Sequence, residues 1–210
     1  ETIRKNNLSC RFILGSTFIV IGKPKQLPID ENSSCNPTTI YGSNRLTSEH
    51  YCLIYNNLYG LDTIIFRITN SFGPLEQYKT PTKNAINYLI YQAYKGNPIS
   101  IYNKGEFFRD VIYVSDVINA LKLLMIKAQS GNLYWIASGR KTWFHEIGKW
   151  LNELTNTQVN YVEPPEYTSK VDVGNFYVDN SKLKSLGWDT LVSPKDGIIK
   201  TLDYFHEQSL

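Results

Sequence analysis

The sequence predicts an α/β fold built around a parallel sheet. Short apolar runs of four to six residues, rich in Ile, Val, Leu, Phe and Tyr, alternate with longer segments whose apolar residues recur at helical spacing. Turn-forming Gly, Pro, Asn and Ser stand between these segments. A chain of 210 residues can bury enough apolar surface for one domain or for two small intertwined ones.

The first half of the chain is expected to run strand, helix, strand, helix. Asn36 followed by Pro37 gives the first helix a cap and a first turn. Turn-forming residues at 15–17, 69–74 and Gly96 end the two strands and the second helix. The expected elements are a strand at 11–14, a helix at 38–57, a strand at 63–68 and a helix at 82–95.

The second half continues the alternation. Asp116 stands where it can cap a helix that follows a strand. The residues Trp143, Ile147, Leu151 and Leu154 recur every three or four positions, as on an amphipathic helix. The expected strands lie at 99–102, 110–114 and 133–138, and the expected helices at 116–129, 143–154 and near 194–207. The tail also holds the segments 176–179 (FYVD) and 181–188 (SKLKSLGW).

Composition argues against several classes of function. The net charge is only +3, from 22 basic and 19 acidic residues, and no basic block stands out, so nucleic-acid binding is not expected. No run of 18 apolar residues is present, so no membrane span is expected. The scattered histidines share no ligand spacing with Cys10, Cys35 or Cys52, so no metal site is expected. These cysteines and the absence of a signal-like start indicate reduced thiols in a cytoplasm.

One pair of side chains has a spacing with a chemical use. Tyr41 and Arg45 are four residues apart in a predicted helix, so a phenol and a guanidinium can share one face. A free tyrosine has a pKa of about 10, and a cation nearby favours the ionised phenol. Such a pair suits proton exchange with a hydroxyl, although the same spacing also arises by chance on a solvated helix face.

Five motifs surround this pair in a recognisable order. They are the segments 16–22 (STFIVIG), 41–45 (YGSNR), 67–74 (RITNSFGP), 105–117 (GEFFRDVIYVSDV) and 178–188 (VDNSKLKSLGW). Through them the chain resembles the extended short-chain dehydrogenase/reductases, the NAD-dependent epimerase/dehydratase family that acts on nucleotide sugars. The resemblance covers nearly the whole chain, and the set of motifs is far more specific than any member of it.

The resemblance implies a fold and a division into domains. Residues 1–73 with 110–137 would form the C-terminal portion of a Rossmann-type parallel sheet domain, and residues 74–109 with 138–210 a small α/β substrate-binding domain. It also implies NAD or NADP as cofactor and a nucleotide sugar as substrate. The family's glycine-rich loop is not among these residues, and the chain opens on what looks like the middle of a domain.

The resemblance also assigns residues to roles. Tyr41 would be the base, Thr17 would hydrogen-bond the same sugar oxygen, and Arg45 would occupy the position of the lysine that binds the nicotinamide ribose. Ser16 would lie on the cofactor-facing loop. Three residues would hold the nucleotide diphosphate: Asn70, Asn84 and Arg109.

Several of these residues also have simpler interpretations. Thr17 could only close a strand, Asn70 could only form a turn, and Arg109 could pair internally with a carboxylate. Arg67 and Asp110 are expected to be structural. Two further residues are expected away from the chemistry, one in the core and one in solvent: Trp188 and His145.

Departures from the family pattern narrow the function. Arg45 replaces a lysine, which keeps the charge but changes its shape. Phe18 and Ile19 stand where sugar 4,6-dehydratases carry Asp-Glu, so dehydration is disfavoured. Residues 169–172 keep only the aspartate of the family's R-P-G-D. The expected function is a nucleotide-sugar 4-epimerase, with a 4-ketoreductase or a non-catalytic truncated remnant or binding module as alternatives. Its expected partner is a second copy or an N-terminal chain.

Overall fold

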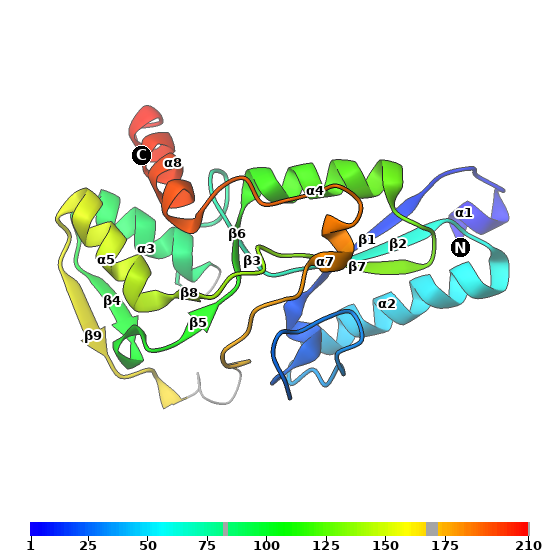
Figure 1. Ribbon diagram of the computed structural model, residues 1–210, viewed down its shortest axis with the longest axis horizontal. Helices are drawn as coiled ribbons and strands as arrows, with labels where there is room; N and C mark the ends of the chain where they lie inside the picture. Colours follow the sequence, from blue (N-terminus) through cyan, green and yellow to red (C-terminus); the bar gives the residue numbers. More distant parts are fainter. Residues whose placement is uncertain (82–83, 167–171, 210) are drawn as a thin grey trace.

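The computed structural model describes residues 1–81, 84–166 and 172–209. Its centre is a parallel sheet in the order β1-β2-β7, so the α/β prediction is confirmed. These strands span Phe12–Thr17, Thr63–Ile68 and Asn132–Ile136. Helix α4 (Val114–Lys127) and helix α2 (Ile40–Tyr59) lie on opposite faces of this sheet (Figure 1).

A second group of elements packs around its own apolar core. Its helices are α3 (Ala85–Tyr94), α5 (Phe144–Thr155) and α8 (Pro194–Glu207), and its strands β4 (Ile99–Tyr102) and β9 (Val159–Val162) pair in parallel (Figure 1). Buried Phe72, Ile90, Leu151 and Phe205 belong to this core. The boundary between two domains stays a prediction.

Short elements connect the two groups. The parallel pair β3 (Asn70–Phe72) and β6 (Val111–Tyr113) and the antiparallel pair β5 (Phe108–Arg109) and β8 (Thr142–Trp143) lie between them (Figure 1). The remaining short helices are α1 (Thr2–Lys5), η1 (Phe18–Ile21), η2 (Asn103–Gly105) and α7 (Ser181–Lys184). In the part of the chain that is described, no helix has the length and apolar character needed to cross a membrane.

Several predicted bounds are confirmed and others are wrong. The strands at 63–68 and 99–102 and the helix at 194–207 have the predicted limits. Strand β1 continues through 15–17, which were expected to close it, because these residues pair with β2 up to Ile68. Residues 82–83 of the predicted helix at 82–95 lie outside the described residues.

The cap of α2 differs from the prediction. Thr39, not Asn36, is its N-cap, and the Thr39 hydroxyl oxygen accepts a hydrogen bond from the Gly42 N–H at 3.1 Å. Asn and Thr both cap helices. Thr39 is the cap here because a helix that starts after it places Gly42 against Ile19 of η1. A Cβ on Gly42 would lie 3.0 Å from the Ile19 carbonyl oxygen, so this close approach requires glycine.

The prediction that Asp116 caps α4 is also wrong. Helix α4 starts two residues earlier, and the buried Asp116 carboxylate accepts hydrogen bonds from the Leu191 and Val192 N–H groups, each at 3.0 Å. Asp116 therefore ties α4 to the segment before α8. The segment 69–74, predicted to be a turn, contains β3. In the tail segment 176–179, Val178 forms an isolated bridge with Ile29.

Gly22 begins the long loop between η1 and α2 and lies against Asn36, near the end of that loop. Its φ is +67°, and a Cβ there would lie 2.1 Å from the Asn36 carbonyl oxygen. Gly22→Ala is expected to lower the free energy of unfolding by about 3 kcal/mol, from left-handed strain and steric overlap together. Gly60→Ala, with φ +64° and open space around it, is the matched control and should cost only about 1 kcal/mol. Equal losses in urea denaturation would contradict the overlap.

Candidate functional site

The predicted pair Tyr41 and Arg45 meets at the start of α2. The Arg45 guanidinium carbon lies 5.4 Å from the centre of the Tyr41 ring. The Arg45 Nη1 donates a hydrogen bond to the Gly15 carbonyl oxygen of β1 at 3.3 Å. Tyr41 is 52% exposed, so its phenol stays accessible from solvent. The helix therefore presents a phenol and a cation together, as the spacing predicted.

Thr17 comes two residues after Gly15, the β1 residue whose carbonyl oxygen binds Arg45. It is the buried last residue of β1, and its hydroxyl oxygen accepts a hydrogen bond from the Ile19 N–H at 3.3 Å. Because Gly42 brings the first turn of α2 against Ile19, the strand end with Thr17 and the helix start with Tyr41 adjoin. Thr17 both ends a strand and lies beside the pair, so the structural interpretation does not remove the functional one.

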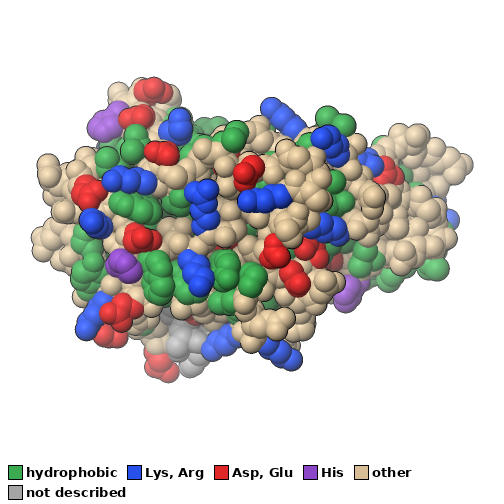
Figure 2. Space-filling model, in the orientation of Figure 1, with side chains coloured by type: hydrophobic (Ala, Val, Ile, Leu, Met, Phe, Trp, Pro, Cys, Tyr) green, Lys and Arg blue, Asp and Glu red, His purple; other side chains and the backbone are tan. Residues whose placement is uncertain are grey.

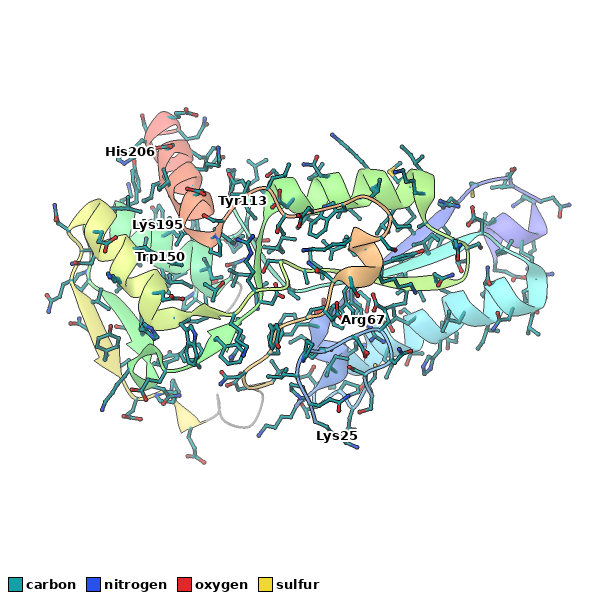
Figure 3. All side chains as sticks on the ribbon, in the orientation of Figure 1. Lys25, Arg67, Tyr113, Trp150, Lys195 and His206 are labelled. Carbon is teal, nitrogen blue, oxygen red and sulfur yellow. The ribbon has the colours of Figure 1, made fainter. Side chains whose placement is uncertain are left out.

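Ser16 was expected on a cofactor-facing loop, but it lies in β1 and its side chain binds a residue of α2. Its hydroxyl donates a hydrogen bond to the buried Glu49 carboxylate. The Arg67 guanidinium binds the same carboxylate, with its Nε 3.0 Å from Oε1 and its Nη2 2.7 Å from Oε2. Arg67 lies between the sheet and α2 (Figure 3). Sequence reasoning expected Arg67 to be structural but missed Glu49, whose spacing of four residues from Arg45 was the available signal.

The charge of Arg67 is stabilised inside the fold. Burial opposes that charge, but the hydrogen bonds and the charge of Glu49 outweigh burial and raise the pKa of Arg67 above its ordinary value. The Arg67 Nη2 also lies 3.0 Å from the Cys35 sulfur. For the Cys35 thiol, burial is the main effect and raises its pKa. This ion pair is consequently a fixed charge-neutral unit beneath the Tyr41 pair.

Asn70 and Asn84 bind to the protein itself. The Asn70 side-chain amide donates to the Asp110 carbonyl oxygen at 3.2 Å. The Asn84 amide donates to the Ser71 carbonyl oxygen at 2.8 Å, and its oxygen accepts from the Asn87 N–H at 3.0 Å as the cap of α3. Asn70 begins a strand, so the turn interpretation is wrong. These contacts hold β3 and the start of α3 in place.

Arg109 lines a recess of about 280 Å³. Its Nη2 lies 2.6 Å from the Asp172 carboxylate, so the internal ion pair considered above exists. The Arg109 guanidinium carbon lies 5.1 Å from the centre of the Phe107 ring. Burial lowers the pKa of Arg109, and Asp172 opposes that effect. The other residues around the recess are Lys23, Tyr102, Asn103, Pro164, Gly174 and Asn175.

The recess is lined by cationic side chains from two distant segments of the chain. Lys23 follows η1 and thus comes shortly after Thr17, while Arg109 comes from β5. Two cationic side chains and an aromatic ring are suited to an anionic ligand that carries a planar group.

Residues 169–171 of the family's R-P-G-D position lie outside the described residues. Basic and acidic side chains are interspersed on the face shown in Figure 2.

Comparison with known protein families identifies the family of this chain. The model of the NAD dependent epimerase/dehydratase family matches residues 1–137. The chain belongs to this family. The resemblance inferred from the five motifs is therefore confirmed, and the family membership accounts for the parallel sheet and for the helix that carries Tyr41.

Relatives of this epimerase/dehydratase chain act on different nucleotide sugars. It is 29% identical over 206 residues to a putative UDP-glucose 4-epimerase of Methanocaldococcus jannaschii, with 97% of this chain and 65% of the relative covered. It is 28% identical over 182 residues to dTDP-glucose 4,6-dehydratase of Salmonella typhimurium, with coverages of 83% and 49%. The chain thus spans no more than about two thirds of these relatives.

Solved structures confirm the fold. The crystal structure of UDP-glucose 4-epimerase from Thermotoga maritima, with UDP-glucose, matches with a TM-score of 0.89 at 27% identity, covering 99% of this chain and 67% of that one. The Thermus thermophilus UDP-glucose 4-epimerase in complex with NAD matches with a TM-score of 0.85 at 22% identity, covering 97% and 66%. The epimerase/dehydratase chain has the Rossmann-type α/β fold of these proteins.

Proposed function

We propose that this chain carries the proton-transfer and sugar-nucleotide-binding part of an NAD(P)-dependent nucleotide-sugar 4-epimerase. The observation that carries the proposal is the contact of Arg45 with the Tyr41 ring, beside Thr17 at the end of β1. The named activities of relatives that match more than nine tenths of the chain support it. The chain spans about two thirds of those relatives, so the whole activity is itself part of the proposal.

The chain's own residues have distinct parts in this proposal. Tyr41 removes the proton from the sugar C4 hydroxyl and later returns it, and Arg45 stabilises the negative charge on the phenol oxygen. The Thr17 oxygen accepts from Ile19, which leaves its hydroxyl proton free to donate to the same sugar oxygen. NAD or NADP, when bound, supplies the acceptor and donor of the C4 hydride.

Arg45 and Tyr41 fit the proposed binding of the cofactor better than Ser16 does. A guanidinium has five N–H donors, and among the described residues Arg45 is hydrogen-bonded only through Nη1 to Gly15, so it can still bind a ribose hydroxyl. Tyr41 is exposed on the same side and fits as well. Ser16 fits less well through its side chain, which is bonded to Glu49. We assign Ser16 to the cofactor-facing strand end through its backbone.

The nucleotide end is assigned to the recess beside Arg109. Arg109 and Lys23 supply the positive charge that a diphosphate requires, and the Arg109 fork can contact Asp172 and a phosphate oxygen together. Asn70 and Asn84 support this end, since the Asn70 amide binds the Asp110 carbonyl next to Arg109 and the Asn84 amide binds the Ser71 carbonyl of β3. The assignment of these three residues to substrate binding is a proposal.

Two alternatives belong to the same family-level function. A 4-ketoreductase would use the same tyrosine and differ only in the fate of the hydride. A non-catalytic truncated remnant or binding module would use the recess beside Arg109 without proton transfer by Tyr41. A cytoplasmic location and a second copy or an N-terminal partner chain remain part of the proposal. A partner is supported by Tyr51, Ile54 and Leu58, which are 60%, 47% and 70% exposed on α2.

Arg109→Ala is expected to weaken binding of UDP by about tenfold to a hundredfold, because a charge-assisted hydrogen bond is lost. Calorimetric titration of the chain with UDP measures this change. Arg11→Ala is the matched control, since Arg11 forms a similar ion pair with Asp62 at 2.9 Å away from the recess. Unchanged affinity in Arg109→Ala, or no binding by the parent chain, would contradict the assignment of the recess.

A further inference from the structure

Glu49 is a buried carboxylate that the proposed chemistry does not use. It is 2% exposed in the middle of α2 and contacts two strands of the sheet. Ser16 of β1 donates to its Oε1, and Arg67 of β2 binds both of its oxygens. Ser16 and Arg67 face each other in the β1–β2 register, so one carboxylate joins the helix to both strands at the same level.

Glu49 and Arg45 contact successive residues of β1. Arg45 donates to the carbonyl of Gly15, and Glu49 accepts from the hydroxyl of the next residue, Ser16. The residue after these two is Thr17. Since Tyr41, Arg45 and Glu49 are spaced by four residues, they lie on one face of α2. Two contacts a turn apart fix the rotation of the helix about its axis, and this rotation decides where Tyr41 points.

Glu49 pairs with one of the two guanidinium groups near this face and leaves the other beside Tyr41. The face holds two guanidinium groups, from Arg45 and Arg67, and one carboxylate, from Glu49. The carboxylate binds Arg67 at 2.7 Å, and the charge of Arg45 is left over the Tyr41 ring at 5.4 Å. If Glu49 bound Arg45 instead, the cation would be drawn away from the phenol and Arg67 would be buried without a counter-charge.

We infer that Glu49 is a positioning residue that fixes the rotation of α2 through Ser16 and Arg67 and so holds Tyr41 and Arg45 beside Thr17. Its use in a reaction rests on the proposed proton transfer by Tyr41, whereas its effect on the orientation of Tyr41 does not. The two can therefore fail separately, and they are tested by different measurements.

The orientation is tested with 3-fluorotyrosine at position 41, read by ¹⁹F NMR. The parent chain should give one line, because the ring has one position over Arg45. Glu49→Gln should split, broaden or move this line, and Ser16→Ala, which leaves no buried charge unpaired, should change it in the same direction. Thr63→Val is the matched control, because it removes a buried hydrogen bond at 3.2 Å between β2 and the Cys52 carbonyl, which lies on α2 beyond Glu49 and farther from Tyr41 along the helix.

The outcomes separate positioning from a general loss of stability. A ¹⁹F line that changes in Glu49→Gln and not in Thr63→Val supports the inference. If Glu49→Gln does not fold, the comparison of Ser16→Ala with Thr63→Val decides. Where Glu49→Gln folds, a line that matches the parent line, or a change equal to that in Thr63→Val, would overturn the inference. Where it does not fold, identical lines in the parent, Ser16→Ala and Thr63→Val chains, or equal changes in the latter two, would overturn it.

Turnover supplies the second measurement. Turnover is measured with NAD and with whatever chain completes the enzyme. Glu49→Gln should lower kcat by about tenfold and leave KM within about twofold, since a misplaced proton acceptor affects the reaction more than binding. Failure to observe any turnover in the parent would count against the proposed function, while the ¹⁹F comparison would still decide the role of Glu49. A larger change in KM than in kcat would contradict positioning of the proton acceptor.

Discussion

Replacing Tyr41 with phenylalanine is expected to lower the rate of nucleotide-sugar epimerisation by about 10²- to 10⁴-fold, the usual contribution of a positioned acid–base group. The substitution removes one oxygen from an exposed ring and leaves the ring contact with Arg45 possible. Stability should therefore change little. The loss would come from the missing proton acceptor at the sugar hydroxyl, with KM for the nucleotide sugar nearly unchanged.

The measurement is conversion of UDP-glucose to its C4 epimer in the presence of NAD and of whatever chain completes the enzyme. Tyr51→Phe is the matched control, because Tyr51 is on the same helix, is 60% exposed and has no part in the proposed site. Arg45→Lys restores the family's residue and should keep most of the rate, whereas Arg45→Ala should lose about tenfold or more. Equal rates in Tyr41→Phe and the parent would contradict the proposal.

Local patterns in the sequence predicted the contact between Tyr41 and Arg45. A separation of four residues on a helix places two side chains together whatever the rest of the fold does, so the contact of Tyr41 with Arg45 followed from spacing. The strand at 63–68 is also a local feature, since its apolar run is bounded by turn residues. The family resemblance then supplied Thr17, whose place beside the pair depends on the parallel sheet.

Long-range pairings could not be predicted in the same way. Ser16 and Glu49 are 33 residues apart, and Arg109 and Asp172 are 63 apart, so no helical or strand period links them. The cap of α2 was wrong for a related reason. Asn36 and Thr39 are both good caps in isolation, and the packing of Gly42 against Ile19 decides between them.

Asp110 is the clearest case of a residue whose role only the fold reveals. It was expected to be structural, and its fully buried carboxylate accepts hydrogen bonds from three separate segments. The donors are the Ser138 N–H and hydroxyl at 2.8 Å each, the Gly139 N–H at 3.0 Å, the Val178 N–H at 3.2 Å and the Thr69 hydroxyl at 3.4 Å. The carboxylate thereby joins the end of β2, the loop after β7 and the segment that pairs with Ile29.

Asp110→Asn is expected to lower the free energy of unfolding by about 4 kcal/mol at pH 7. The amide is nearly the same size, but its NH₂ group must face N–H donors that the carboxylate satisfied, and each unsatisfied buried group costs about 1–3 kcal/mol. Urea denaturation measures the loss. Asp203→Asn, on the exposed side of α8, is the control and should change stability by less than about 0.5 kcal/mol. Equal effects of the two variants would contradict this role.

The same carboxylate predicts a dependence of stability on pH. Burial raises the pKa of Asp110 to about 6, against 3.8 for an unperturbed aspartate. Between these values the folded chain binds more protons than the unfolded chain, so the contribution of this group to stability rises as the pH falls from 6 towards 4 and is constant above 6. Asp110→Asn removes this contribution. The difference in unfolding free energy between the parent and Asp110→Asn should therefore be larger at pH 4.5 than at pH 7.5. A difference that grows with rising pH would contradict this prediction. It would show that the five donors stabilise the carboxylate as the anion.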